Sequence, residues 1–229
     1  MQTEYVTFIA DFKIHGRLAF LSHQETLSLW RRILVRAQVP LIFSQGYNPH
    51  PRLSLPLPRS VGVQSECERL CARVSAEGFC AQTARDAIVP LLPDGCTLIC
   101  TDVVPGRASF YPVSATYQFI LTRSPDPLRQ ARFDRCLRQL QAREPVVLLR
   151  QMEKRRQREI DIGPFLRQLT HTGTNVEVQC TIRPEGTVRV DELMRWLELA
   201  PADLAEPVRR IAAGWVSQAK HWQGEENLS

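Results

Sequence analysis

Apolar and polar residues follow two different periods along this chain, and the changes between them predict a series of strands and helices. Residues 5–13 have an apolar side chain at every second position, which is typical of a half-buried strand. The same alternation returns in residues 66–75 and 97–104, whereas apolar residues in 82–92 have helical spacing. With a helix and a short strand between the first two, this order has the form of a ferredoxin-like unit.

The first helix is predicted to begin at Ser22. Ser22 and Glu25 have the S-x-x-E spacing of a capping box, in which hydroxyl and carboxylate each accept a hydrogen bond from a backbone amide. Apolar residues then recur on one stripe, and polar or basic residues, ending with Arg32 and Arg36, on another. Pro40 ends the helix, because the residue before a proline is driven out of the helical region.

A similar pattern restarts after a stretch with two prolines and a glycine. This stretch, residues 105–112, is the predicted linker between two domains, the first spanning residues 1–104 and the second 113–229. The elements predicted for the second domain are a strand at 117–121, a helix at 127–143 and strands at 146–149, 160–162 and 176–182.

The C-terminal region is predicted to be helical. Asp191 can cap one helix, and apolar residues from Leu204 to Trp222, including Trp215, form a long stripe. We therefore expect an α+β protein with two ferredoxin-like halves, each with a mainly antiparallel sheet, plus C-terminal helices.

Arginine dominates the charge of the protein. The 229 residues carry a net charge of +5, and 26 of the 29 basic residues are arginine. The planar guanidinium suits phosphates and base edges, so this excess is consistent with RNA contact, although a GC-rich genome would produce it too. No apolar run approaches the ~20 residues of a membrane span, and the N-terminus lacks the pattern of a signal peptide. We expect a cytoplasmic protein with no membrane partner.

Residues 44–52, SQGYNPHPR, form the most distinctive stretch of the chain. Glycine, asparagine and two prolines, which permit or fix special backbone angles, surround several hydrogen-bonding side chains. The candidate binding residues here are His23 at the helix start, Gln45, Tyr47, Asn48, His50, Arg52 and Arg59. Amides and guanidinium groups would bind phosphate, and Tyr47 could stack on a base. We expect the Ser22 helix start and this loop to converge on an anion pocket; a purely structural loop is the alternative.

These residues also carry a resemblance to a known family. The run FLSH, the amphipathic helix and FSQGYNPHPRLSLPLP with VGVQSE resemble the signature of the radical SAM-associated domain family, in its standalone form. Residues 155–166, RRQREIDIGPFL, are similar to a second block of that family, and the resemblance covers most of residues 5–197. The family has no assigned biochemical role. Because its members occur fused to radical SAM domains or as separate chains, the resemblance implies a radical SAM enzyme as partner.

The chain itself lacks the ligands of a radical SAM cluster. Cys67 and Cys71 match the first two cysteines of the C-x3-C-x2-C motif, but Val74 stands at the third position. A zinc site from these two cysteines with Cys96 and Cys100 would require unusual spacing within predicted strands. The seven cysteines are typical of reduced, buried thiols, and we predict no metal and no cofactor.

A second candidate surface follows the second predicted strand of the C-terminal half. Lys154, Arg155, Arg156 and Arg158 carry four positive charges in five residues, which is typical of a solvated loop or of a surface for nucleic acid or an acidic partner. Asp161 faces away from its isoleucine neighbours, toward a polar cleft or toward water.

We expect an accessory module, not an enzyme, that binds RNA or presents a substrate to a separate radical SAM enzyme. No G-x-S-x-G elbow or identifiable acid partner accompanies the serines and histidines. Two alternatives remain open. One is an enzyme acting on nucleic acid through His23, His50 and Asp161, and the other is a protein-interaction adaptor that uses the helix with Trp215 and Trp222.

Overall fold

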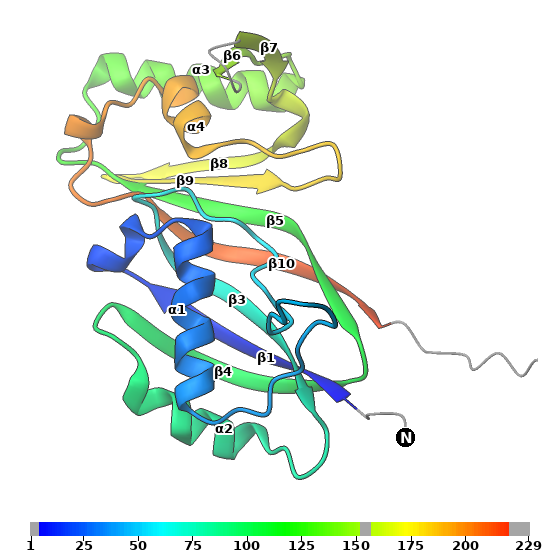
Figure 1. Cartoon of the computed structure of the whole chain (residues 1–229). Coiled ribbons are helices and arrows are strands. Elements are labelled where there is room, and N and C mark those ends of the chain that lie inside the picture. The colour runs from blue at the N-terminus through cyan, green and yellow to red at the C-terminus, as the bar shows by residue number, and fades with distance from the viewer. Residues whose placement is uncertain (1–4, 152–156, 220–229) are drawn as a thin grey trace, which may run out of the picture.

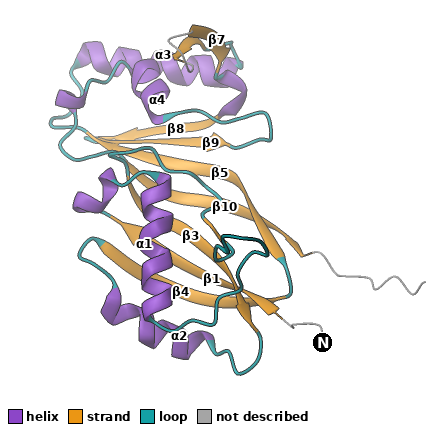
Figure 2. Cartoon of the chain, in the orientation of Figure 1, coloured by secondary structure: helices purple, strands orange, loops and turns teal. Residues whose placement is uncertain are grey.

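The computed structural model describes residues 5–151 and 157–219 and confirms an α+β fold (Figure 1, Figure 2). The first half contains the strands β1 (Tyr5–Ile14), β2 (Leu53–Ser54), β3 (Gln64–Ser75) and β4 (Cys96–Pro105) and the helices α1 (His23–Arg36) and α2 (Ala81–Ile88). β1 lies between β3 and β4 and is antiparallel to both, and β2 pairs antiparallel with β3. The chain order and the strand order β4-β1-β3-β2 are those of a ferredoxin-like unit.

The core of this half lies between the sheet and α1. The capping box is present as predicted: the Ser22 amide donates to a Glu25 carboxylate oxygen at 2.8 Å, and the Glu25 amide donates to the Ser22 hydroxyl at 3.3 Å. Trp30 of α1 is fully buried against Phe12 of β1, with ring centroids 4.6 Å apart. The alternation of β1 therefore places its even-numbered side chains against the helix.

The second half repeats this order around a second core. Its elements are β5 (Ala108–Ile120), α3 (Pro127–Ala142), β8 (Leu166–Thr172), β9 (Asn175–Thr181), α4 (Val190–Leu197) and β10 (Arg209–Ala219), with the hairpin β6 (Val147–Gln151) and β7 (Gln157–Asp161) inserted after α3. The strand order β10-β5-β9-β8 again matches the ferredoxin-like arrangement. Short 3₁₀ turns complete the two halves at Gly16–Phe20, Val89–Leu91, Gly163–Phe165 and Pro201–Asp203.

The two halves share one eight-stranded sheet. β10 pairs in parallel with the first residues of β3, where Arg209 lies opposite Gln64 and Arg210 opposite Ser65. This pairing is possible because β2 has only two residues and covers β3 only at Cys71 and Ala72. One edge of β3 therefore pairs with β10 at its beginning and with β2 near its end. We say that the sheet forks at the place where these two strands diverge along β3.

The long C-terminal helix predicted for residues 204–222 is wrong, because residues 209–219 form β10. β10 pairs along most of its length with β5, and such long-range pairing overrides local helical spacing. Gly214, which disfavours a helix interior, lies in its middle. Trp215 is thus a strand residue, and Trp222 lies outside the described residues.

Two further predictions are corrected by the fold. Residues 105–112, predicted to be a linker, form the end of β4, a turn and the start of β5. The helix predicted to be capped by Asp191 is α4, whose N-cap position is Arg189. In the described ranges, none of the helices is long and apolar enough to cross a membrane.

Candidate functional site

The SQGYNPHPR loop folds back on itself beside the end of β3. The Ile42 amide donates to the Arg73 carbonyl at 2.8 Å, the Arg73 amide to the Arg52 carbonyl at 3.0 Å and the Arg52 amide to the Ile42 carbonyl at 2.9 Å. Within the loop, the amides of Ser44 and His50 donate to the His50 carbonyl and the Ser44 hydroxyl. These bonds hold Arg52 against Arg73.

A cleft of about 560 Å³ lies between this loop and the start of β5. Its near wall comes from the loop and β2, with Ser44, His50, Arg52, Ser54 and Pro56. Its far wall is the continuous stretch of residues 107–112, and Thr7, Cys71 and Arg73 also line it. The cleft therefore occupies the region where the sheet forks, between β2 and β5.

A contact from β1 brings the far wall into place. The Thr7 hydroxyl donates to the Gly106 carbonyl at 2.8 Å and accepts from the Ala108 amide at 3.0 Å. These two bonds hold the turn between β4 and β5 and place Arg107 at the edge of the cleft.

Arg69 of β3 fixes the position of β5 and β10 further along. Its guanidinium makes a bidentate ion pair with Asp11 of β1, with distances of 2.7 and 2.8 Å. The same group lies 5.2 Å from the ring centroid of Phe110 in β5 and 5.0 Å from that of Trp215 in β10. Cation–π contacts of this kind attach β5 and β10 to the face of β3.

Positive charge converges on the cleft from three segments. Arg52, Arg73 and Arg107 line it, whereas no Asp or Glu among the described residues does so. Burial is the largest cause that lowers the pKa of Arg73, and the charges of Arg107 and Arg52 lower it further. Tyr5 has the opposite effect on this pKa, and its ring centroid lies 5.6 Å from Cζ of Arg73. The lining of the cleft is therefore positively charged, with no carboxylate among the described residues that line it.

The structure brings together some of the predicted loop residues and not others. His50 and Arg52 line the cleft, whereas Gln45, Tyr47 and Asn48 are exposed on the same loop and do not. Arg107 and Arg73, which do line it, carry no local sequence signal, because their approach depends on strand pairing.

The expected convergence of the helix start with this loop is wrong. Arg59 donates to the carbonyls of Leu21 and Val63, so the chain just before α1 lies beside the start of β3. The loop lies beside Arg73, nine residues further along β3, or roughly 30 Å. The loop closes on itself instead of returning along α1.

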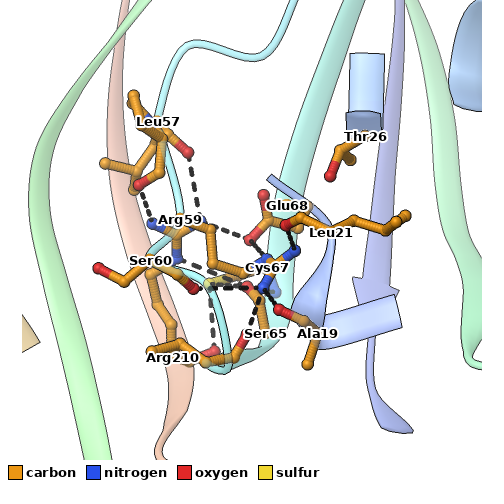
Figure 3. A network of polar contacts seen from close by, with 12 residues as sticks. Ala19, Leu21, Thr26, Leu57, Arg59, Ser60, Ser65, Cys67, Glu68 and Arg210 are labelled. Atoms are coloured by element: carbon orange, nitrogen blue, oxygen red, sulfur yellow. Dashed lines mark hydrogen bonds and ion pairs between the residues drawn. The ribbon is translucent and has the colours of Figure 1, made fainter. Parts of the chain in front are cut away.

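Arg59 is a structural residue and not an exposed ligand-binding group, which corrects its predicted role. It is 9% exposed, and its guanidinium donates to the carbonyls of Ala19 and Val63 at 2.6 Å (Figure 3). Burial lowers the pKa of Arg59, and the nearby Glu68 raises it. The side chain holds the turn before α1 to the chain before β3.

Arg158 and Asp161, the two described residues of the predicted second surface, do not line the cleft. One Asp161 oxygen accepts from the amides of Val146 at 2.7 Å and Gly163 at 2.9 Å, so this carboxylate stabilises the ends of the β6–β7 hairpin. Arg158 is exposed on β7, and Lys154, Arg155 and Arg156 lie outside the described residues. Of the three residues considered for an enzyme acting on nucleic acid, His50 lines the cleft, whereas His23 and Asp161 do not.

Cysteine side chains could hold a metal ion or supply a nucleophile. In residues 5–151 and 157–219 no group of three or more His, Cys, Asp or Glu side chains is placed to hold a metal ion. Cys71 lines the cleft, but burial raises its pKa to about 12, against the effect of the Arg69 charge. A thiol that is protonated at neutral pH is a poor nucleophile.

Comparison with known proteins identifies a family and little else. A family model described as "Uncharacterized protein conserved in bacteria (DUF2344)" matches residues 8–190. None of the curated proteins matches the chain. A chain of the structure "Crystal Structure of a Cbf5-Nop10-Gar1 Complex" is similar with a TM-score of 0.43 and 13% identity. The similarity covers 90% of this chain and 49% of that chain, so this protein spans about half the length of that one.

Proposed function

Since the chain belongs to the family of uncharacterized proteins conserved in bacteria (DUF2344), we propose its function from the geometry of its cleft: the protein is an accessory module that binds RNA through the phosphate backbone. Arg52, Arg73 and Arg107 hold the phosphate oxygens as charge-assisted donors. The hydroxyls of Ser44 and Ser54 and the imidazole of His50 supply further hydrogen bonds.

The single observation that carries this proposal is the convergence of three arginines on one cleft without a described carboxylate. Like charges gathered in this way repel one another, so the arrangement lowers the stability of the unliganded protein unless an anion neutralises the charges. The guanidinium fork binds phosphate with two parallel hydrogen bonds, which explains why arginine suits this site.

The test is RNA binding measured by fluorescence anisotropy with a short labelled RNA. We expect Arg52→Ala, Arg73→Ala and Arg107→Ala each to weaken binding about tenfold or more, since one charge-assisted hydrogen bond contributes about 1.5 kcal/mol or more. Arg138→Ala, which removes an exposed arginine of α3, is the matched control and should leave the affinity unchanged. If all four variants bind RNA with the affinity of the wild type, the proposal is refuted.

We further propose that the module presents its RNA to a separate radical SAM enzyme. This part rests on the resemblance of residues 44–52 and 155–166 to the radical SAM-associated family. It is tested by purifying a radical SAM enzyme from the same genome with and without this protein. An enzyme that neither co-purifies with the protein nor acts faster on RNA in its presence would exclude the partnership.

A further inference from the structure

One strand, β10, contacts both walls of the cleft. Residues 215–219 of β10 pair with residues 108–112 of β5, which form most of the far wall. Earlier in the same strand, the guanidinium of Arg210 donates to the carbonyls of Leu57 and Pro58, at 3.3 and 3.2 Å (Figure 3). These two residues directly follow Pro56, which lines the near wall. A strand of the second half therefore holds both walls of the cleft.

The near wall is rich in proline where Arg210 holds it. Pro56 and Pro58 have no amide proton, so they cannot donate a backbone hydrogen bond. Among the described residues, no amide of residues 55–61 donates to a backbone carbonyl. The side chain of Leu57 is buried, and its carbonyl and that of Pro58 accept from Arg210. The hydrogen bonds of one guanidinium thus fix the backbone next to Pro56.

Arg210 cannot itself reach RNA. Its side chain is 1% exposed, and Glu68, which is 4% exposed, neutralises its charge. Arg210 is also not among the described residues that line the cleft. Any effect of this residue on RNA binding must therefore act through the position of the walls.

We propose that Arg210 is a positioning residue for RNA binding, which fixes the near wall relative to the far wall that its own strand carries. This inference rests on the proposed RNA-binding function and gives the second half a part in it. Arginine suits this task because its planar fork offers five donors, enough for the Glu68 carboxylate and two carbonyls at once. Lysine would keep the charge beside Glu68, but its compact ammonium would not replace the fork that spans the two carbonyls.

The experiment compares Arg210→Lys with a matched substitution in the second half. Arg150 also donates to a buried glutamate, Glu192, and to a backbone carbonyl, that of Thr187, but none of these three residues lines the cleft. Both full-length variants should unfold more easily than the wild type. In the fluorescence anisotropy assay with a short labelled RNA, Arg210→Lys should bind at least about fivefold more weakly, the effect of about one lost hydrogen bond. Arg150→Lys should bind with the affinity of the wild type.

Two cysteines distinguish a shifted wall from general unfolding. Cys71 is 7% exposed and lines the cleft, and Ser54 of the near wall lies opposite it in the sheet. Cys180 is fully buried in the second core. In Arg210→Lys, alkylation of Cys71 should be accelerated by a larger factor than that of Cys180, because a shifted near wall uncovers only Cys71. In Arg150→Lys, Cys71 should not be accelerated more than Cys180.

A second variant tests the inference if Arg210→Lys does not fold. Glu68→Gln with Arg210→Met removes both charges of the buried pair and leaves the two carbonyls of the near wall without their donor. Glu192→Gln with Arg150→Met is its matched control. The first double variant should weaken RNA binding at least about fivefold, as Arg210→Lys does, and the second should not change it.

The possible outcomes separate this inference from the proposed function. Wild-type affinity of the Arg210 variants, an equal loss of affinity in the Arg150 controls, or equal acceleration of Cys71 and Cys180 would overturn the inference, while the variants of the three cleft arginines still support RNA binding. If those three variants bind RNA as the wild type does, the proposed function itself fails.

Discussion

Arg210 of β10 and Glu68 of β3 form a buried ion pair that joins the two halves of the sheet (Figure 3). Their side chains are 1% and 4% exposed. Arg210 also donates to the carbonyls of Leu57 and Pro58, and Nε of Arg59 lies 3.9 Å from the same Glu68 carboxylate. The Glu68 carboxylate thus neutralises the guanidinium groups of both Arg210 and Arg59. Its loss would leave two buried cations without a counter-ion.

We expect Glu68→Gln to lower the free energy of unfolding by about 3–5 kcal/mol, the usual cost of breaking a buried pair. The double variant Glu68→Gln with Arg210→Met should lose less than the sum of the single variants, with a coupling energy of about 0.5–3 kcal/mol. Urea unfolding of the four proteins measures this cycle. Additive losses would show that the two residues act independently.

A second buried pair predicts the response to acid. Glu192 of α4 is fully buried and accepts from Arg150 at 2.5 and 2.7 Å. Burial alone raises the pKa of Glu192, but the hydrogen bonds from Arg150 and the Arg189 amide outweigh it and hold the pKa below its usual value. The pair therefore adds stability above the unfolded pKa of ~4.3, and this stability is lost as the pH falls through the lower folded pKa.

Glu192→Gln should accordingly cost about 3 kcal/mol at neutral pH, and its difference from the wild type should shrink below pH ~4. Asp191→Asn is the matched control, because Asp191 is exposed and its bridge to Arg195 contributes about 0.5 kcal/mol or less. Thermal unfolding across the acid range provides the comparison. A difference that stays constant with pH would contradict the assignment of this stability to ionised Glu192.

Features that depend on neighbouring residues could be predicted from the sequence. The capping box of α1 needs only Ser22 and Glu25, which lie within one helical turn. Local periodicity in the same way predicts the first ferredoxin-like half with nearly the right strands, and the second half without β10. For the same reason, the loop that forms one wall of the cleft was recognised from residues 44–52.

Features that depend on distant pairing could not be predicted. β10 is a strand because β3 and β5 offer it partners, although its apolar spacing also suits a helix. Arg107 reaches the cleft through the contact of Thr7 with the turn before β5, across about 100 residues of sequence. The burial of Arg59, which looks like a surface arginine in the sequence, depends on the same long-range packing.

The cysteines are predicted to differ sharply in reactivity. Cys80 is exposed at the start of α2, and the amide and hydroxyl of Thr83 lower its pKa. Burial raises the pKa of Cys96 and Cys180 to about 12. Limited alkylation at neutral pH, followed by mass spectrometry, should therefore label Cys80 first and the two buried thiols only after unfolding.

Two comparisons check the cause of this order. Cys100 is also exposed, but burial and then Asp11 raise its pKa, so it should react more slowly than Cys80. Thr83→Ala should slow the labelling of Cys80 without changing that of Cys100. Equal rates for the two exposed cysteines would show that accessibility alone controls the reaction.

Neutralising an arginine of the cleft should change stability and binding in opposite directions. Arg107 is exposed and faces Arg73, whose pKa it lowers, so the two charges repel each other in the free protein. Arg107→Gln removes this repulsion and should leave the free energy of unfolding unchanged or raise it by up to ~0.5 kcal/mol, the usual range for a surface site. The same change should weaken RNA binding and reduce the slope of log K against log salt concentration by about 0.7–0.9, because one phosphate contact is lost. Thermal unfolding with and without RNA measures both effects. RNA at 100 times its Kd stabilises the wild type by about 2.7 kcal/mol, and the variant should gain less at the same concentration.

If the Arg107→Gln protein is instead less stable than the wild type without RNA, Arg107 stabilises the fold, as Arg59 does.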